Sequence, residues 1–301
     1  MAHDIKAILL DIDGTLTNDG KVITPRTREA LLKCQEKGVV LVLASGRTAT
    51  GLSTYAADLD LAHHGGVLVC YNGAKSLNCE TGQVYFEQAL TAEQTRRVLE
   101  HMKKFEVAPV VDHGEYMYVN DCFFTVPDGE GGRRLIIQYE GHSNNYLLCE
   151  KRDLAEFCAW PTNKILNAGD PDYLQEHWQE MAAPFEGELT AMFTSPVYFE
   201  FTPLGVDKVR ALKDTFAVLG IDRSEVMSFG DAQNDLTMIK WAQIGVAMGN
   251  AVDEVKAEAD YVTGDNNSDG IADAPQPLAV GATTARQPPH AARPSGWWPP
   301  R

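Results

Sequence analysis

The sequence predicts an α/β protein, in which a Rossmann-like core with a parallel sheet carries an inserted α/β cap domain. Near both ends of the chain, short apolar runs alternate with helical patterns. That alternation implies right-handed crossovers between parallel strands. The residues between these two blocks carry alternating apolar segments and several aromatics, which is a different pattern. A chain of 301 residues is long enough for two domains with buried cores.

The first block predicts three strands. Residues Ile5–Leu10 form an apolar run that stops at an acid, and Pro25–Lys37 reads as a helix that Gly38 ends. The continuous apolar run Val39–Ala44 is typical of a strand buried on both faces. A third run, Val67–Cys70, leads into a turn dipeptide.

The same pattern returns late in the chain. A helix with one apolar face ends at Gly220, and the strand Val226–Phe229 follows it. Leu236–Ala242 is then predicted as a helix and Ile244–Ala247 as a further strand. The two blocks form one sheet if the piece between them is an insertion.

The inserted piece is predicted to be a second α/β domain. Tyr116–Asn120 alternates like a strand, and Lys164–Ala168 followed by Asp170–Met181 reads as strand and then helix. Its aromatics are expected in the core rather than against a substrate. Five polar residues are each expected at the surface: His113, His142, Arg133, Arg134 and Lys164.

The expected domain boundaries follow from this division. The core should comprise residues 1–82 and 197–273, and the cap domain residues 83–196. From residue 275 onward the chain holds seven prolines, three arginines and no acid. A segment of that composition buries too little apolar surface to fold, so we expect residues 274–301 to form a disordered tail.

Charge and composition exclude several classes of partner. The formal net charge of −16 argues against nucleic acid, whose phosphates need clustered Lys and Arg, and against an anionic membrane. No apolar segment approaches the length of a membrane span. The start of the chain has no signal-peptide layout, and the six cysteines are spread out as expected of reduced core thiols. We therefore expect a cytoplasmic protein.

Two acids follow the first predicted strand. Asp11 and Asp13 lie two residues apart, so both carboxylates can face one spot beyond the sheet edge, and Gly14 allows a sharp turn. Such a pair suits a divided task, in which Asp11 attacks phosphorus and Asp13 serves as general acid and base. The alternative is a pair of solvated acids in a turn.

The second predicted strand ends at another polar group. Ser45, Gly46 and Arg47 offer a hydroxyl and backbone N–H groups at a strand-to-helix junction, which is a favourable place for an anion. The alternative is that Ser45 only caps the following helix.

Lys208 falls in the first turn of a predicted helix, where the helix dipole disfavours a cation. That position indicates an anionic partner, for which a phosphate is suitable. The alternative is a long side chain that reaches into solvent.

Three polar residues follow the strand Val226–Phe229. Asp231 can join Asp11 and the backbone carbonyl of Asp13 in an oxygen-only shell around Mg²⁺. Asn234 could bind the phosphate, and Asp235 could orient Lys208 or a metal-bound water. The alternative for Asn234 and Asp235 is that they cap the N-terminus of the next helix.

With these four stretches, the chain resembles the haloacid dehalogenase superfamily, and within it the Cof-type branch with a large α/β cap. The resemblance extends from residue 5 to about 273. It implies that Asp11 is the nucleophile, Asp13 the general acid and base, and Asp231 a Mg²⁺ ligand. Ser45 and Lys208 are implied as the phosphate clamp. Further residues are implied at or near the site: Asn234, Asp235, Asn72 in the turn Tyr71–Ala74, and Asn266.

The resemblance implies a Mg²⁺-dependent phosphatase that acts on small phosphorylated metabolites, such as sugar phosphates or phosphorylated flavin and pyridoxal cofactors. The cap would close over the substrate. A phosphomutase shares the same machinery, and a non-catalytic protein that binds a phosphorylated ligand is a further alternative. The substrate and the oligomeric state stay open at this point.

Overall fold

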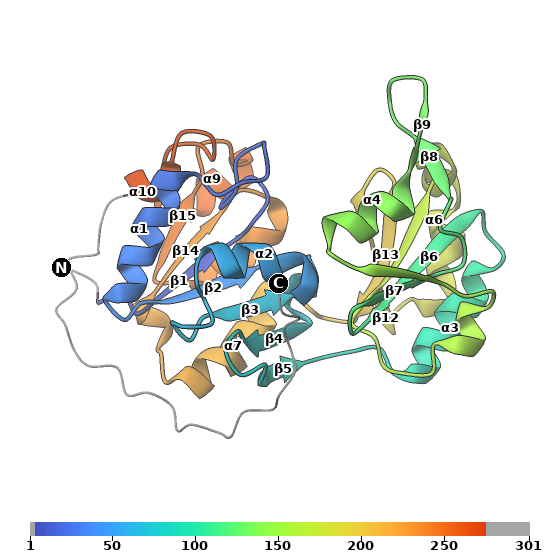
Figure 1. Cartoon of the computed structure of the whole chain (residues 1–301), viewed down its shortest axis with the longest axis horizontal. Helices are drawn as coiled ribbons and strands as arrows, with labels where there is room; N and C mark the ends of the chain where they lie inside the picture. Colours follow the sequence, from blue (N-terminus) through green and yellow to red (C-terminus); the bar gives the residue numbers. More distant parts are fainter. Residues whose placement is uncertain (1–3, 275–301) are drawn as a thin grey trace. The chain divides into compact units, whose positions relative to one another are not determined.

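The computed structural model describes residues 4–274, which form two compact units (Figure 1). The core unit contains the described residues up to Glu87 and from Asp207 onward, and the inserted unit spans Gln88–Val206. The predicted α/β class with a parallel-sheet core is confirmed. The tail that we expect to be disordered lies outside the described residues, except for Ala274.

The core unit contains an eight-stranded sheet in the order β16-β15-β14-β1-β2-β3-β4-β5. The first six strands in this order pair in parallel, and β4 and β5 are antiparallel additions. Its strands are β1 (Ala7–Leu10), β2 (Val40–Ala44), β3 (Val67–Cys70), β4 (Lys75–Asn78), β5 (Val84–Glu87), β14 (Val226–Gly230), β15 (Ile244–Ala247) and β16 (Tyr261–Val262).

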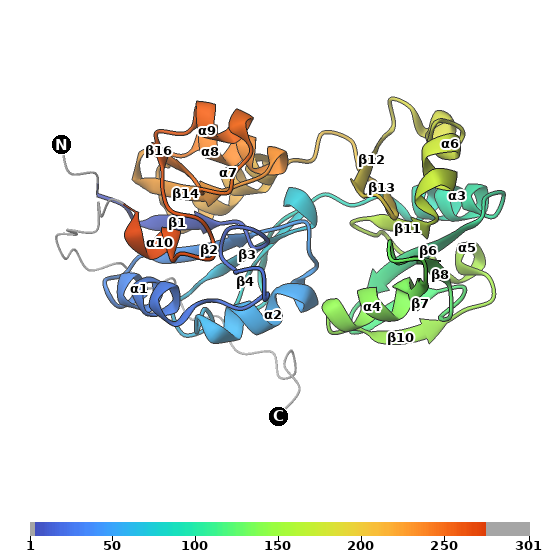
Figure 2. The same ribbon diagram turned by 90° about the horizontal axis from the view of Figure 1, so that it is seen from above.

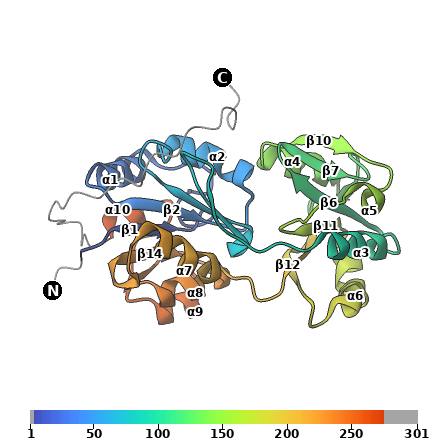
Figure 3. The same cartoon turned by 90° about the horizontal axis from the view of Figure 1, so that it is seen from below.

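Helices cover both faces of this sheet. Figures 2 and 3 show α1 and α2 on one face and α7, α8 and α9 on the other. The helices are α1 (Pro25–Glu36), α2 (Ala49–Asp58), α7 (Lys208–Leu219), α8 (Leu236–Trp241), α9 (Asp253–Glu258) and α10 (Gly270–Asp273), with short 3₁₀ turns η1 (Tyr71–Gly73), η3 (Arg223–Glu225) and η4 (Gln233–Asp235).

Local sequence explains these elements. The β1 and β14 strands are buried at every position, so β1 is an unbroken apolar run and β14 is mostly apolar, with the buried Ser228 at its centre. The α1 helix begins with Thr24 as N-cap and Pro25 in the first turn. The α7 helix ends at Gly220, whose left-handed conformation favours glycine. Each parallel strand therefore ends at the same sheet edge, where the polar loops begin.

The inserted unit contains a six-stranded, mostly antiparallel sheet in the order β10-β7-β6-β11-β13-β12. Its strands are β6 (Val107–His113), β7 (Tyr116–Val119), β10 (Leu147–Glu150), β11 (Ile165–Gly169), β12 (Leu189–Ser195) and β13 (Tyr198–Pro203), with a separate pair β8 (Thr125–Pro127) and β9 (Arg133–Leu135). Its helices are α3 (Ala92–Met102), α4 (Ile136–Ser143), α5 (Leu154–Phe157), α6 (Pro171–Ala182) and the 3₁₀ turn η2 (Ala183–Phe185). One apolar cluster joins the sheet to α3, α5 and α6, and another joins it to α4.

Both boundaries between the units fall later in the sequence than expected: they lie at 87/88 and 206/207, instead of 82/83 and 196/197. The β5 strand pairs with β4 and so extends the core sheet to Glu87. The β13 strand pairs with β11 and β12, so it belongs to the inserted unit. Strand pairing, which the local pattern does not reveal, thus moves both boundaries.

One surface prediction is wrong. The Lys164 side chain is only 14% exposed, and its Nζ lies 3.5 Å from a carboxylate oxygen of Glu200. Lys164 directly precedes β11, and β11 is paired with β13, which carries Glu200. The other four polar residues expected at the surface are exposed: His113, His142, Arg133 and Arg134.

All six cysteines are free thiols, as predicted. Four are buried (Cys34, Cys70, Cys79 and Cys158), and Cys122 and Cys149 are half-buried. Among residues 4–274, the helices are all too short or too polar to span a bilayer.

Candidate active site

Lys208 lies at the centre of the polar residues that gather at the carboxyl edge of the core sheet. It is the first residue of α7, and its side chain is 0% exposed. Its Nζ donates to Asp11 Oδ1 and to Asp235 Oδ1, at 2.6 Å each. Burial lowers the pKa of this ammonium group, but Asp11 and Asp235 outweigh that effect and raise it. The solvent-exposed alternative for Lys208 is therefore wrong.

Asp11 follows β1 directly, and its backbone N–H donates to the carbonyl of Phe229 on β14. Burial, together with Asp235, raises the pKa of the Asp11 carboxyl to about 7, and Lys208 opposes this shift. Asp11 Oδ2 accepts no hydrogen bond from any residue in the described part of the chain. One oxygen is thus fixed by Lys208 while the other is available for chemistry.

Asp235 differs from Asp11 because both of its oxygens are occupied. Oδ1 binds Lys208, and Oδ2 accepts the backbone N–H groups of Asp231 and Ala232 at 2.9 and 3.0 Å. Gly230 fits closely here, because a Cβ at that position would lie 2.5 Å from the Asp235 Cβ. Asp235 therefore anchors Lys208 and the loop after β14, and its role as a supporting acid in catalysis stays a prediction.

Asp231 faces the first loop across the sheet edge. Thr15 Oγ1 donates to its Oδ1 at 2.6 Å, and burial raises the pKa of the Asp231 carboxyl. Gly14 has a φ of +86°, and a Cβ on it would lie 2.4 Å from Asp231 Oδ2. The close approach of the two loops thus requires glycine at position 14.

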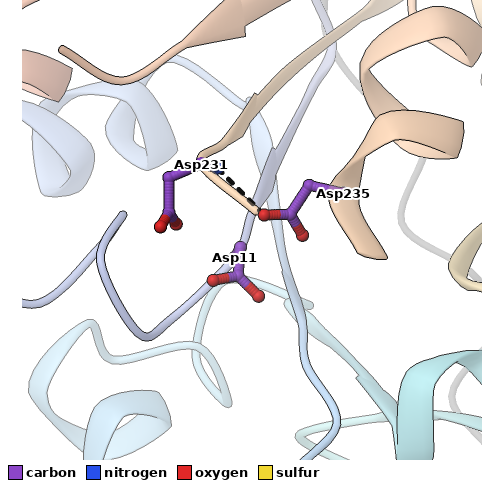
Figure 4. A group of neighbouring side chains, drawn as sticks. All are labelled: Asp11, Asp231 and Asp235. Atoms are coloured by element: carbon purple, nitrogen blue, oxygen red, sulfur yellow. Dashed lines mark hydrogen bonds between the residues drawn. The ribbon is translucent and has the colours of Figure 1, made fainter. Parts of the chain in front are cut away.

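Asp11, Asp231 and Asp235 form one acidic group, shown in Figure 4, with an oxygen of each within 4.8 Å of the others. Three carboxylates against one lysine leave a net negative charge in a largely buried place. Carboxylate oxygens are the ligands that Mg²⁺ prefers. The residues therefore fit a divalent cation, and the open oxygens of Asp11 and Asp231 are better placed to bind it than those of Asp235.

The Asp13 side chain lies outside this acidic group. Its carboxylate accepts two hydrogen bonds from Arg47, at 2.8 and 2.9 Å, and one from Lys21 at 2.8 Å. Burial acts to raise its pKa, but these two cations prevail and lower the pKa to about 2. Asp13 is therefore a bound carboxylate here, and the role expected of its backbone carbonyl toward a metal stays a prediction.

The second and third loops lie side by side. Ser45 Oγ accepts the backbone N–H of Arg47 at 3.2 Å, whereas Thr48 provides the N-cap of α2. The alternative role of Ser45 as the helix cap is therefore wrong. Asn72 lies against Gly46, whose added Cβ would be 3.0 Å from the Asn72 amide nitrogen.

Asn234 reaches the same place from the loop after β14. Its Nδ2 donates to Asn72 Oδ1 at 3.2 Å. Tyr71 and Asn72 both adopt a positive φ of 53°, an uncommon conformation for residues with side chains. The predicted residues Ser45, Gly46, Asn72 and Asn234 are thus brought together by a strained turn.

Asn266 has a different role from the residues above. Its Nδ2 donates to the backbone carbonyl of Thr17 at 3.0 Å, so it supports the end of the first loop. Sequence reasoning missed Thr15 and Lys21, which bind Asp231 and Asp13. It also missed Asn250, which binds the Gly14 carbonyl. The only signal for Thr15 and Lys21 was their closeness in sequence to Asp13.

Known proteins of similar sequence and structure indicate the family to which this chain belongs. The family model for haloacid dehalogenase-like hydrolases matches residues 8–274. The chain is 30% identical over 287 residues to 5-amino-6-(5-phospho-D-ribitylamino)uracil phosphatase YcsE of Bacillus subtilis, covering 90% of this chain and 94% of that protein.

Two solved structures are similar throughout. A haloacid dehalogenase-like hydrolase from Bacteroides thetaiotaomicron has a TM-score of 0.82 and 34% identity, covering 89% of this chain and 97% of that one. The subclass IIB sugar phosphatase BT4131 has a TM-score of 0.68 and 25% identity, covering 89% and 96%.

Proposed function

The chain belongs to the haloacid dehalogenase-like hydrolases and is a phosphoric monoester hydrolase of that family, and we propose the following mechanism and substrates for it. It hydrolyses small phosphorylated metabolites with Mg²⁺, through a phosphoryl group carried on Asp11. One observation carries the proposal: Asp11 is buried, one of its oxygens is held by Lys208, and the other accepts no hydrogen bond from the described residues, while an oxygen of Asp231 lies within 4.8 Å of an Asp11 oxygen. A buried, fixed carboxylate with one open oxygen is what nucleophilic attack requires.

Asp11, Asp231 and the backbone carbonyl of Asp13 would hold Mg²⁺, which supplies positive charge beside the phosphoryl oxygens. Lys208 adds a fixed cation next to Asp11. Ser45, Gly46 and Asn234 would bind the remaining phosphoryl oxygens through N–H and hydroxyl groups.

In the first step, Asp11 Oδ2 attacks phosphorus, and the bond to the leaving oxygen breaks. Asp13 gives its proton to that oxygen. In the second step, Asp13 takes a proton from water, the water oxygen attacks phosphorus, and the bond to Asp11 breaks to release inorganic phosphate. Before the first step, Asp13 must leave Arg47 and Lys21, which hold it ionised, and take up a proton from solvent. A substrate phosphate that competes for Arg47 provides a reason for that release.

The relatives support the choice of substrate class. Both named activities, on a ribityl phosphate and on sugar phosphates, concern a phosphate ester of a polyhydroxylated carbon chain. We therefore place sugar phosphates and ribityl phosphates first, ahead of other phosphorylated cofactors such as pyridoxal phosphate.

A phosphate-release screen over these ester classes, with and without EDTA, tests the proposal. We expect turnover that EDTA abolishes, and in Asp11→Asn a loss of about 10⁴-fold or more in kcat. Asp214→Asn removes the same charge from the exposed face of α7 and serves as the control. Undiminished phosphate release by Asp11→Asn would remove Asp11 as nucleophile. Transfer of the phosphoryl group to another sugar, without free phosphate, would indicate a phosphomutase instead.

A further inference from the structure

Asn250 connects the loop after β15 to the loop that carries Asp11 and Asp13. Its Nδ2 donates to the Gly14 carbonyl oxygen at 2.8 Å, and its Oδ1 accepts the backbone N–H of Asn266 at 3.0 Å. Only one orientation of the amide satisfies both bonds, since Gly14 offers an acceptor and Asn266 a donor. Both ends of this side chain are therefore used.

Gly14 is the residue of the first loop whose backbone rotates most freely. It has a φ of +86°, and it lacks the Cβ that restricts other residues. It separates Asp13, whose backbone carbonyl we expect at the metal, from Thr15, whose hydroxyl binds Asp231. The Gly14–Thr15 peptide lies between these two groups. Its N–H donates to the Ile12 carbonyl at 3.4 Å, and Asn250 makes the shorter bond, to its carbonyl.

The segment that carries Asn250 is itself firmly held. The backbone N–H of Gly249 donates to the carbonyl of Gly264 at 2.9 Å. A Cβ on Gly249 would lie 2.8 Å from the backbone nitrogen of Asp265, so the two segments are in close contact. Asn266, from the same segment, binds the carbonyl of Thr17. Asn250 and Asn266 thus hold the beginning and the end of residues 14–17 from one packed support.

We propose that Asn250 is a positioning residue, which holds the Gly14 peptide so that the Asp13 carbonyl and the Asp231 carboxylate face the same cation. The inference rests on the proposed function, because it assigns Asn250 to that site. Outer residues that orient metal ligands commonly contribute tenfold to a hundredfold in metal affinity.

Two variants separate the two hydrogen bonds of Asn250. Asn250→Ala removes both. Asn250→Asp keeps an acceptor for the Asn266 N–H but replaces the donor to Gly14 with an oxygen that repels the carbonyl. We expect both variants to bind Mg²⁺ about tenfold more weakly than the wild type in calorimetric titration. In Asn250→Asp this loss should occur despite the added negative charge, and its melting temperature should stay near that of the wild type.

The control is Gln243→Glu, which adds the same charge at an exposed residue of the core unit. It should bind Mg²⁺ like the wild type. Wild-type affinity in Asn250→Asp would overturn the proposal, because the side chain would then only support Asn266. Unchanged affinity in Asn250→Ala would overturn it as well. If Asn250→Ala fails to fold, Asn250→Asp decides.

The titration needs no substrate, so it separates this inference from the proposed function. A wild-type protein that binds Mg²⁺ but releases no phosphate from any ester would refute the proposed function, and the two variants would still decide the role of Asn250. A wild-type protein that binds no Mg²⁺ would overturn the inference directly.

Discussion

The core unit and the inserted unit each bury a lysine beside acidic side chains. The two arrangements differ in the distance between the lysine nitrogen and the carboxylate oxygens. In the core unit, Lys208 is 0% exposed and binds Asp11 and Asp235 at 2.6 Å each. In the inserted unit, Lys164 is 14% exposed and lies 3.5 Å from Glu200. Asp235 is also tied to two backbone N–H groups. The buried charges of the core unit are thus held in one geometry by several short bonds.

This difference indicates where the chemistry resides. Burying charges costs more free energy than a hydrophobic replacement would, so a buried cluster alone is weak support for a role in stability. A cluster with a raised acid pKa, placed where parallel strands end, is a candidate for catalysis. The looser Lys164–Glu200 pair lies in a mostly antiparallel sheet, and we expect loss of one partner to lower the stability of its unit, because the other charge is then left buried.

The largest expected effect comes from removing the core lysine. Lys208→Met leaves Asp11 and Asp235 buried without their cation and takes a positive charge from the phosphoryl site. We expect kcat/KM to fall about 10³-fold and the free energy of unfolding to fall by about 3–5 kcal/mol. Steady-state kinetics and urea denaturation measure the two. Lys213→Met, on the exposed face of α7, is the control. A kinetic loss below about tenfold would contradict the role given to Lys208.

A smaller effect is expected from pH in the metal-free protein. Asp11 has a folded pKa of about 7, above the value near 4 of an unfolded chain. Between these values the native state keeps a proton that the unfolded chain has lost. The contribution of Asp11 to the free energy of unfolding therefore decreases as pH rises through this window.

Urea denaturation in EDTA checks this dependence. From about pH 5 to about pH 7, the wild type should lose about 2 kcal/mol more than Asp11→Asn, which has no carboxyl to titrate. Asp214→Asn should follow the wild type, because its carboxylate is on the surface. Parallel profiles of wild type and Asp11→Asn would show that the burial of Asp11 does not shift its pKa as the structure indicates.

The smallest effect on turnover is expected in the inserted unit, with a change in stability similar in size to the pH effect. Lys164→Met leaves Glu200 buried without this cation, but Lys164 is partly exposed and the contact is long. We expect a loss of about 2 kcal/mol in the free energy of unfolding. Turnover of p-nitrophenyl phosphate should stay within about threefold of the wild type, because Lys164 belongs to no part of the proposed phosphoryl site. Lys104→Met, at an exposed position, is the control. A stability loss equal to that of Lys208→Met would remove the distinction between the two units.

Several parts of the site follow from local pattern. Asp11 and Asp231 each follow a short strand that is mostly apolar, and parallel strands bring such ends to one edge of a sheet. The apolar face of α7 likewise predicted that Lys208 lies in the first turn of that helix. Sequence alone therefore located the acids and the lysine that the structure brings together.

Other parts depend on contacts between distant segments. The partners of Asp13 are Lys21 and Arg47, which reach it from a turn and from the loop after β2. Asn250 binds Gly14 across 236 residues of sequence. The burial of Lys164 depends on the pairing of β11 with β13. No periodicity in the sequence contains this information, because loop conformations are set by the packing beneath them.

By itself the sequence determined the class of fold, the order of its elements and the residues at the ends of the parallel strands. These features depend on hydrophobic patterning and on the direction of the chain, both of which are local. Only the tertiary structure decided which carboxylate stays open, which is bound by cations, and which asparagine holds the Gly14 peptide. Those outcomes depend on hydrogen bonds between loops, and such bonds form only when the folded sheet brings the loops within about 3 Å of one another.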